Sequence, residues 1–195
     1  AAPAVPAHPE LAPELPQDDL ILQMKSVSKT YSMRAGKSWQ PETKIHACRG
    51  IDFSLQRGKT LAIVGESGSG KTTAARIALG AELPNEGGEV LFRATPQSKP
   101  IAVHQMSRAA RTAFQREAQM VFQDPYSSLS PRMRILDALC EPLEIHNIGS
   151  KSDRRDRAGK MLKLVGLGPD MLLRYPHAFS GGQRQRLSIA RALML

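Results

Sequence analysis

The sequence predicts an α/β fold in which strands come first and a helical subdomain follows. Segments of the first half alternate between apolar and polar residues, which is typical of half-buried strands. A continuous apolar run, TLAIV at residues 60–64, leads directly into a glycine-rich loop and a helix, which favours a buried parallel strand. From residue 130 onward the apolar residues recur at helical spacing. Together these patterns indicate an α/β core that bears a helical subdomain.

The chain is long enough to bury one ordinary core. Its 195 residues are 41% hydrophobic and 23% charged, a balance that is typical of a globular chain and not of a disordered one. No apolar run approaches the roughly 20 residues of a membrane span, and no signal-peptide pattern opens the sequence. We therefore expect neither an integral membrane protein nor an exported one.

The net charge is strongly positive. Lys and Arg number 27 against 18 Asp and Glu, which gives +9. Such a charge permits contact with nucleic acid or an anionic membrane. However, aromatic residues make up only 5% of the chain, and no basic block is interleaved with them. A protein that binds phosphate groups is also expected to carry a positive charge. Nucleic-acid binding is therefore the less favoured interpretation.

Two cysteines, Cys48 and Cys140, stand far apart in the sequence and form no CxxC pair. No histidine lies at a spacing suited to zinc. They therefore predict buried, reduced thiols of a cytosolic protein.

The first part of the chain predicts a tail and then short strands. Residues 1–17 are rich in Ala and Pro and predict an extended linker or tail, and the domain is expected over residues 18–195. Residues 32–45, which include Trp39, predict a loop, and Arg57-Gly58 predicts a turn. The expected strands are residues 20–27, 51–56, 60–64, 88–92 and 119–122, and the expected helices of this part are residues 71–81 and 107–117.

Three further helices are expected in the second half. Ser130-Pro131 predicts an N-cap followed by proline at the first helical position. The second helix is expected between an N-cap at Ser152 and a glycine just past its end at Gly166. The third begins at Ser180 and continues to the last residue. The helical subdomain is expected over about residues 126–182.

The strongest chemical signal is the loop after residues 60–64. It reads GESGSGKT and fits G-x-x-x-x-G-K-[ST] in full, between a predicted strand and a predicted helix. Its glycines let successive N–H groups point at an anion, and the helix N-terminus adds a positive dipole end. Lys71 supplies a charge for the β- and γ-phosphates, Thr72 a hard oxygen ligand for Mg²⁺, and Thr73 a donor to the α-phosphate. The residues expected to bind a nucleoside triphosphate are Gly65, Glu66, Ser67, Gly68, Ser69, Gly70, Lys71, Thr72 and Thr73.

A second phosphate-binding helix end is predicted near the end of the chain. Ser180 would cap a helix whose first turn holds Gly181 and Gly182, so its N–H groups can approach an anion closely. A single γ-phosphate could satisfy both helix ends if two copies of the domain packed head to tail. Taken alone, these residues fit a plain N-cap with a flexible glycine turn equally well.

Taken together, residues 20–195 resemble an ABC-transporter ATPase. The resemblance rests on the P-loop, on FSGGQRQR at residues 179–186 where the family has its LSGGQ signature, and on VFQDP at residues 121–125 as the Q-loop. Within the family, QMVFQDPYSSLSPRMRI and RYPHAFSGGQRQRLSIARAL are similar to the peptide-importer branch, the dipeptide, oligopeptide and nickel uptake group. The resemblance implies a P-loop NTPase of the ABC ATPase type, whose mixed sheet has an antiparallel part and an inserted helical subdomain. Residues 93–106 follow the family poorly, and His104 is assigned only to a surface loop.

The resemblance also implies roles for single residues. Tyr31 matches the aromatic residue that stacks on adenine; from the residues alone it could simply pack on its own sheet. Gln123 matches the residue that contacts Mg²⁺ and the attacking water and links to the membrane partner; alone it could be an ordinary amide at a strand end. With Lys71 it is a candidate catalytic residue. The signature residues that reach the γ-phosphate of the other subunit are Ser180, Gly181, Gly182 and Gln183.

The family uses further acidic residues and a histidine that this sequence does not offer. An Asp at the end of a second apolar strand, a Glu beside it as the base and a later His follow the signature helix in the family. Asp124 ends an apolar segment, but Gln123 interrupts that segment and Pro125 follows at once, which favours the Q-loop interpretation. The apolar helix end ARALML predicts a chain cut from a longer protein, and the C-terminal strands of the sheet are expected in the missing part.

The resemblance implies the ATP-binding and hydrolysing subunit of a bacterial ABC importer for peptides or similar small solutes, with ATP and Mg²⁺ as cofactors. The expected partners are a second ATPase domain (identical, similar or fused), membrane-embedded permease subunits and, indirectly, an extracytoplasmic solute-binding protein. The expected location is the cytoplasmic face of the cell membrane. Two alternatives stay open: a nucleotide-binding module without turnover and, with less support, a soluble ABC ATPase that acts on nucleic acid.

Overall fold

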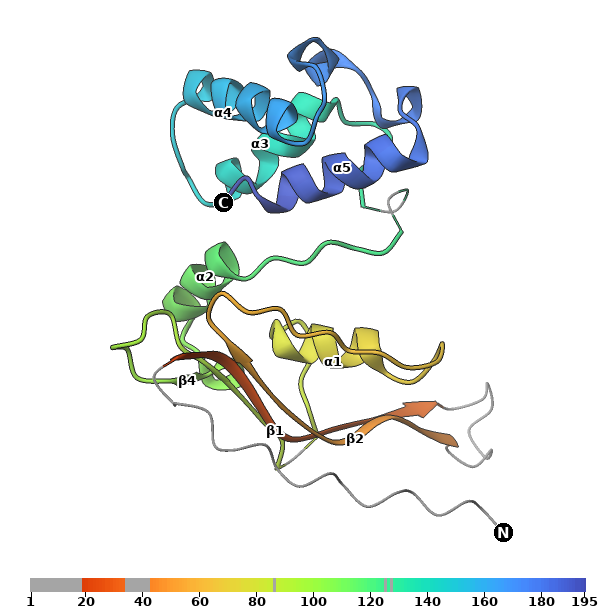
Figure 1. Ribbon diagram of the computed structural model, residues 1–195, viewed down its shortest axis with the longest axis vertical. Helices are drawn as coiled ribbons and strands as arrows, with labels where there is room; N and C mark the ends of the chain where they lie inside the picture. Colours follow the sequence, from red (N-terminus) through yellow and green to blue (C-terminus); the bar gives the residue numbers. More distant parts are fainter. Residues whose placement is uncertain (1–18, 34–42, 86, 125, 127) are drawn as a thin grey trace. The chain divides into compact units, whose positions relative to one another are not determined.

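The computed structural model describes residues 19–33, 43–85, 87–124, 126 and 128–195 and divides the chain into two compact units. The first unit extends to Arg111, and the second runs from Thr112 to Leu195 (Figure 1). Helix α2 (Arg108–Glu117), close to the predicted residues 107–117, crosses this boundary. The predicted tail over residues 1–17 and Trp39 lie outside the described residues.

The described part of the first unit contains a four-stranded antiparallel sheet, in the order β2-β1-β3-β4. β1 pairs with β2 along its length, from Leu20 opposite Gln56 to Met33 opposite Thr43. The loop predicted over residues 32–45 is therefore too long, because both of its ends belong to this ladder. The strands are β1 (Leu20–Met33), β2 (Thr43–Gln56), β3 (Glu89–Phe92) and β4 (Ile101–Ala102).

A bulge in β1 keeps two apolar residues on the core side. Met24 and Val27 are both buried although they are three residues apart, which breaks the strict alternation of a strand. The register shifts between them, and Ser26 takes a positive φ of 48°, as expected where one strand carries an extra residue. The Ser26 N–H donates to Oδ1 of Asp52 at 2.8 Å, so the group displaced from the ladder keeps a partner.

Two of the predicted strands are wrong. Residues 60–64 and 119–122 form no strand, and Leu61, Ile63 and Val64 are 42%, 45% and 89% exposed. A buried parallel strand needs hydrogen-bonded neighbours, and the sheet of the described residues provides none for residues 60–64. The apolar run therefore has the composition of a central strand without the partners that would make it one.

Helix α1 (Lys71–Ala78) follows the glycine-rich loop and covers one face of the sheet formed by β1 and β2 (Figure 1). Ala74, Ile77 and Ala78 form its buried side. The helix ends three residues earlier than predicted because Gly80 takes a φ of 65° and its N–H donates to the Ile77 carbonyl at 3.0 Å. A glycine in this conformation ends helices in general.

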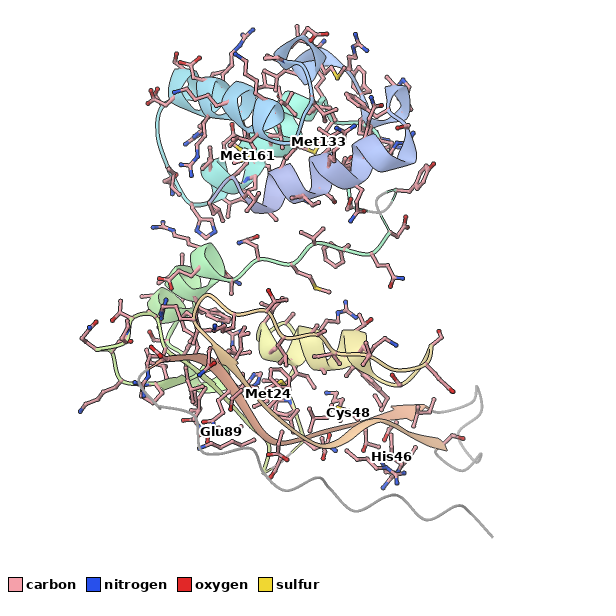
Figure 2. All side chains as sticks on the ribbon, in the orientation of Figure 1. Met24, His46, Cys48, Glu89, Met133 and Met161 are labelled. Carbon is pink, nitrogen blue, oxygen red and sulfur yellow. The ribbon has the colours of Figure 1, made fainter. Side chains whose placement is uncertain are left out.

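Three helices of the second unit share one apolar core. They are α3 (Ile135–Ile145), α4 (Lys151–Leu164) and α5 (Gly181–Ala192), with short 3₁₀ turns at Pro169–Leu173 and Pro176–Ala178. Met161 lies among them (Figure 2). None of the helices that the structure describes is long and apolar enough to cross a bilayer. The most deeply buried core residues are Ile135, Leu139, Leu143, Ala158, Leu162, Leu187, Ala190 and Met194.

The start of α3 differs from the prediction. Ser130-Pro131 forms a turn, in which the Met133 N–H donates to the Ser130 carbonyl at 3.2 Å, and the helix begins only at Ile135. The Ile135 N–H donates to the Arg174 carbonyl at 3.0 Å. A backbone carbonyl distant in sequence therefore satisfies the first of the open N–H groups at this helix end.

The N-cap of α4 is Ser150 and not the predicted Ser152. Ser150 Oγ accepts from the Asp153 N–H at 3.2 Å, and Oδ2 of Asp153 accepts from the Ser150 N–H at 2.9 Å. This reciprocal capping box satisfies the backbone N–H groups of both residues. A cap at Ser152 would leave these two groups without their partners. The predicted glycine after the helix is confirmed: Gly166 follows the C-cap with a φ of 71°.

Both cysteines are buried and neither forms a disulfide, as predicted. Burial raises the pKa of both thiols, which keeps them neutral. Figure 2 labels Cys48 and Met24, which are buried in the first unit, and His46, which is exposed. The cysteines therefore act as small core residues.

His104 is not the surface-loop residue that the sequence predicts. Its Nδ1 and Nε2 are, among the described residues, the only buried side-chain nitrogens or oxygens without a hydrogen-bond partner. Burial lowers the pKa of His104, and Arg111 lowers it further. In the unfolded chain, His104 binds a proton at the ordinary histidine pKa of about 6.5. In the folded chain it binds the proton only at a lower pH.

We therefore expect the protein to lose stability as the pH falls below about 6.5, until the lowered pKa of His104 in the folded state is passed. His104→Leu should remove this part of the pH dependence. Urea unfolding of both proteins at about pH 7.5 and about pH 5.5 measures it. An identical loss of stability in the variant would show that His104 does not cause it.

Candidate functional site

The loop before α1 presents backbone N–H groups to solvent. Residues 65–69 are exposed, and Gly68 and Gly70 take φ values of 82° and 89°, a region that favours glycine. Gly70 is the N-cap of α1, and glycine has no side chain with which to cap the first turn. The N–H groups at this helix end are therefore open to an anion.

Gly70 also lets the loop approach the sheet closely. A Cβ on this residue would lie 2.0 Å from the Ala47 carbonyl oxygen of β2, a distance that no side chain tolerates. The loop and the start of α1 are thus packed directly on β2, which fixes the helix end against the sheet.

The Lys71 side chain folds back over the loop. Its Nζ donates to the carbonyl oxygens of Gly65 at 2.7 Å and Glu66 at 2.6 Å, and lies 3.5 Å from Ser69 Oγ. These acceptors are neutral and exposed, so a phosphate group would offer the ammonium stronger, charge-assisted hydrogen bonds. The position of the ammonium suits a bound polyphosphate.

The two threonines of the first turn differ in their surroundings. Thr72 is exposed, and its hydroxyl is a hard oxygen ligand of the kind that Mg²⁺ prefers. Among the described residues, no group of three His, Cys, Asp or Glu could hold a metal ion. The Thr73 hydroxyl instead bonds to Tyr31 and thereby lowers its pKa in part.

Tyr31, near the end of β1, lies within reach of this helix. Its hydroxyl donates to Oε1 of Glu82, and Lys29 Nζ lies 5.4 Å from the centre of its ring. The bond to Glu82 and burial raise the Tyr31 pKa. The structure therefore brings together Tyr31 and the first turn of α1, two parts of the predicted site that are distant in sequence.

In the second unit, Gln123 is exposed at a bend. Oδ1 of the neighbouring Asp124 accepts from the Tyr126 N–H at 2.9 Å, which is a local turn contact. Asp124 does not end a strand, since residues 119–122 form none.

Ser180 caps α5 as predicted. Its Oγ accepts from the Gln183 N–H at 3.3 Å, and Oε1 of Gln183 accepts from the Ser180 N–H at 2.9 Å. Phe179 is 5% exposed and belongs to the core, so it anchors the helix start, whereas Ser180 and Gly182 are exposed. The Gln183 side chain thus holds the cap, and the glycine-lined first turn faces solvent.

One face of α5 holds the segment that follows Gln123. The Arg184 guanidinium lies 4.2 Å from the Tyr126 ring centre, Ser188 Oγ lies 2.5 Å from Ser128 Oγ, and Arg191 donates to the Ser128 carbonyl at 3.0 Å. Sequence analysis missed these contacts. The available signal is the spacing of Arg184, Ser188 and Arg191, which places them on one helix face.

Comparison with known proteins decides the family. The model of the ABC transporter family matches residues 48–195. The chain belongs to the ABC transporter family. It is 41% identical over 177 residues to the di/tripeptide transport ATP-binding protein DppF of Pseudomonas aeruginosa, covering 91% of this chain and 52% of that protein. It is 43% identical over 175 residues to the dipeptide transport ATP-binding protein DppF of Escherichia coli, covering 90% of this chain and 50% of that protein.

The chain therefore spans about half the length of these curated ABC relatives. These relatives are named as di/tripeptide and dipeptide transport proteins, which confirms the predicted resemblance to the peptide-importer branch. Tyr31 precedes the residues that the family model matches, whereas the P-loop, Gln123 and the signature all fall within them.

Solved ABC structures confirm the predicted fold class. The dimeric ATP-binding cassette MJ0796, in a post-hydrolysis state bound to ADP and Pi, matches with a TM-score of 0.73 and 32% identity, over 89% of this chain and 69% of that chain. The cbiO1 protein of Clostridium perfringens matches with a TM-score of 0.65 and 27% identity, over 90% and 62% of the two chains. The chain has the ABC ATPase fold, and that fold binds ATP.

Proposed function

We propose that this chain is the ATP-binding part of an importer ATPase that hydrolyses ATP to move peptides or similar small solutes across the cell membrane. The observation that carries the proposal is the pair of helix N-termini, at Gly70 of α1 and Ser180 of α5, that are open to an anion. If two copies of the domain pack head to tail, the α1 end of one copy and the α5 end of the other can bind the same γ-phosphate.

Each residue would have a definite task. The P-loop amides and Lys71 bind the β- and γ-phosphates, and Tyr31 stacks on the base. Thr72 and Gln123 would hold a Mg²⁺ ion, which neutralises phosphate charge. Gln123 also orients the attacking water, and the partner domain's signature stabilises the charge that develops on the γ-phosphate.

The partners follow from the same proposal. A second ATPase domain completes the site, permease subunits receive its motion, and the protein binds at the inner face of the membrane. Relatives named for di/tripeptide, dipeptide and glutathione transport support small peptides as the solute class.

The test measures self-association and phosphate release by the intact protein. We expect it to dimerise with Mg-ATP but not with ADP and to release phosphate. Dimers without phosphate release would favour the module without turnover. Salt-sensitive binding of duplex DNA would favour the nucleic-acid alternative. Absence of ATP binding, dimerisation and phosphate release would overturn the proposal.

A further inference from the structure

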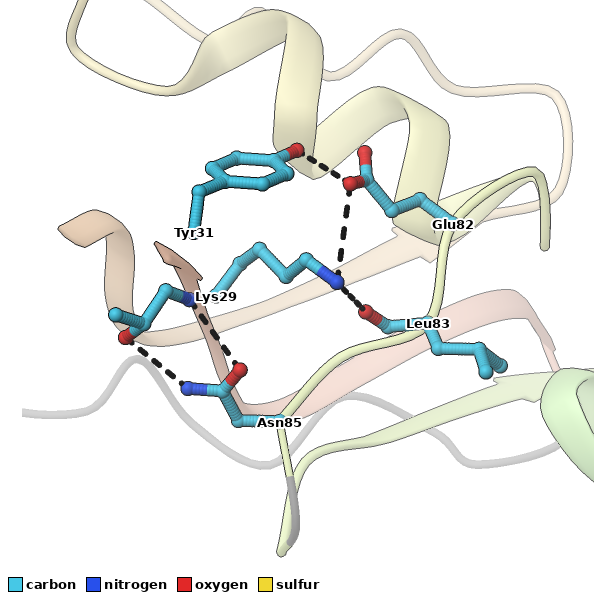
Figure 3. A network of polar contacts seen from close by, with 6 residues as sticks. Lys29, Tyr31, Glu82, Leu83 and Asn85 are labelled. Carbon is cyan, nitrogen blue, oxygen red and sulfur yellow. Dashed lines mark hydrogen bonds and ion pairs between the residues drawn. The ribbon is translucent and has the colours of Figure 1, made fainter. Parts of the chain in front are cut away.

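The segment after α1 is fastened to β1 without help from any ligand. Lys29 Nζ donates to the Leu83 carbonyl at 2.8 Å. The Thr30 N–H donates to Oδ1 of Asn85 at 3.2 Å, and Nδ2 of Asn85 donates to Thr30 Oγ1 at 3.2 Å. Residues 82–85 are therefore held in a fixed register against the end of this strand (Figure 3).

Within this segment, the Glu82 carboxylate interacts with two side chains of β1. Its carboxylate accepts a hydrogen bond from the Tyr31 hydroxyl and lies 3.7 Å from Lys29 Nζ. The Lys29 and Glu82 side chains are each only 18% exposed, so the pair is partly shielded from water. Figure 3 shows the hydroxyl and the ammonium both directed at this carboxylate. A bond to a charged acceptor is stronger than one between neutral groups.

The bond to Glu82 fixes the tyrosine ring at its far end. A tyrosine side chain turns about two bonds, and an anchored hydroxyl restricts both rotations. Lys29 Nζ stands 5.4 Å from the ring centre and occupies one face, so a base would stack on the other. A ring that is ordered before binding saves the entropy that a mobile ring would lose.

We propose that Glu82 is a positioning residue for the nucleotide: it holds the Tyr31 hydroxyl and so keeps the ring in the orientation on which the adenine base stacks. This inference rests on the proposed function, because it requires that Tyr31 meets the base of ATP. It assigns to Glu82 no contact with the phosphates.

The experiment compares two ligands on the intact protein, Mg-ATP and Mg-tripolyphosphate, which lacks the base. E82A should weaken ATP binding about fivefold to tenfold and leave tripolyphosphate binding unchanged. Y31F, which keeps the ring and loses the hydroxyl, should weaken ATP binding equally. The double variant should lose no more than either single variant, because one bond is removed in each case. E82Q, whose amide oxygen still accepts the bond, should stay within about twofold of the wild type.

Two controls separate the possible failures. E89A removes an exposed glutamate of β3 in the same unit and should change neither affinity. Lys71→Ala should weaken both ligands; if it weakens neither, the proposed function fails. If Lys71→Ala acts and E82A and Y31F bind ATP like the wild type, the inference is overturned. Equal loss of ATP and tripolyphosphate in E82A also overturns it, because Glu82 would then support the P-loop and not the ring.

Discussion

Lys71→Ala should abolish measurable Mg-ATP binding by the intact protein. In the free protein the Lys71 ammonium is held by the carbonyl oxygens of Gly65 and Glu66 at 2.7 and 2.6 Å. Exchanging these neutral acceptors for phosphate oxygens gives the ammonium charge-assisted bonds that alanine cannot make. We expect a loss of affinity of at least about a hundredfold.

Titration calorimetry with Mg-ATP measures this loss. The free energy of unfolding should change little, because the two carbonyls are exposed and can bond to water instead. Lys59→Ala is a matched control: it removes the same charge from an exposed position of the same unit and should leave the affinity unchanged. Undiminished affinity in Lys71→Ala would contradict the assignment of the P-loop.

Local signals predicted much of this fold. The P-loop and the following helix depend on glycines, a lysine and threonines within a few residues, and α1 begins at Lys71 as expected. Ser180 forms the predicted N-cap, and Gln183, which completes it, lies only three residues away. Where the determinants are adjacent in sequence, composition and spacing contain the necessary information.

Contacts between distant residues could not be predicted in this way. Residues 60–64 have the composition of a buried strand, but whether they form one depends on neighbours in a sheet. Glu82 meets Tyr31 across 51 positions, and Arg191 meets Ser128 across 63. Helical spacing places Arg191 on one face of α5 but does not identify Ser128 as its partner, and no spacing connects Glu82 with Tyr31. The residue that we propose to position the tyrosine ring is therefore found only from the structure.

Ser180→Ala should lower both stability and ATP turnover, and a second serine of the same unit separates the two effects. Ser150 and Ser180 are both exposed N-cap residues, and both form a capping box with the residue three positions later. Either alanine variant should lose about 1 kcal/mol of unfolding free energy. Only Ser180→Ala should lose turnover, by about tenfold or more, because only this hydroxyl is proposed to reach a γ-phosphate. Urea unfolding and phosphate release by the intact protein measure the two quantities.

Other capping residues at the same two positions make the separation sharper. Asp and Asn cap helices about as well as Ser. S180D should unfold like the wild type, because the Gln183 side chain that faces it is neutral. S150N is the control: the Ser150 hydroxyl donates to Oδ2 of Asp153 at 2.7 Å, and Asn can both cap the helix and donate to this carboxylate. S150N should therefore unfold like the wild type and hydrolyse ATP normally. The carboxylate of S180D would instead stand where the partner's γ-phosphate is expected, and repulsion between like charges should reduce turnover below that of Ser180→Ala. Normal turnover in S180D would contradict the proposed role of the α5 N-terminus, whatever the stability of the variant.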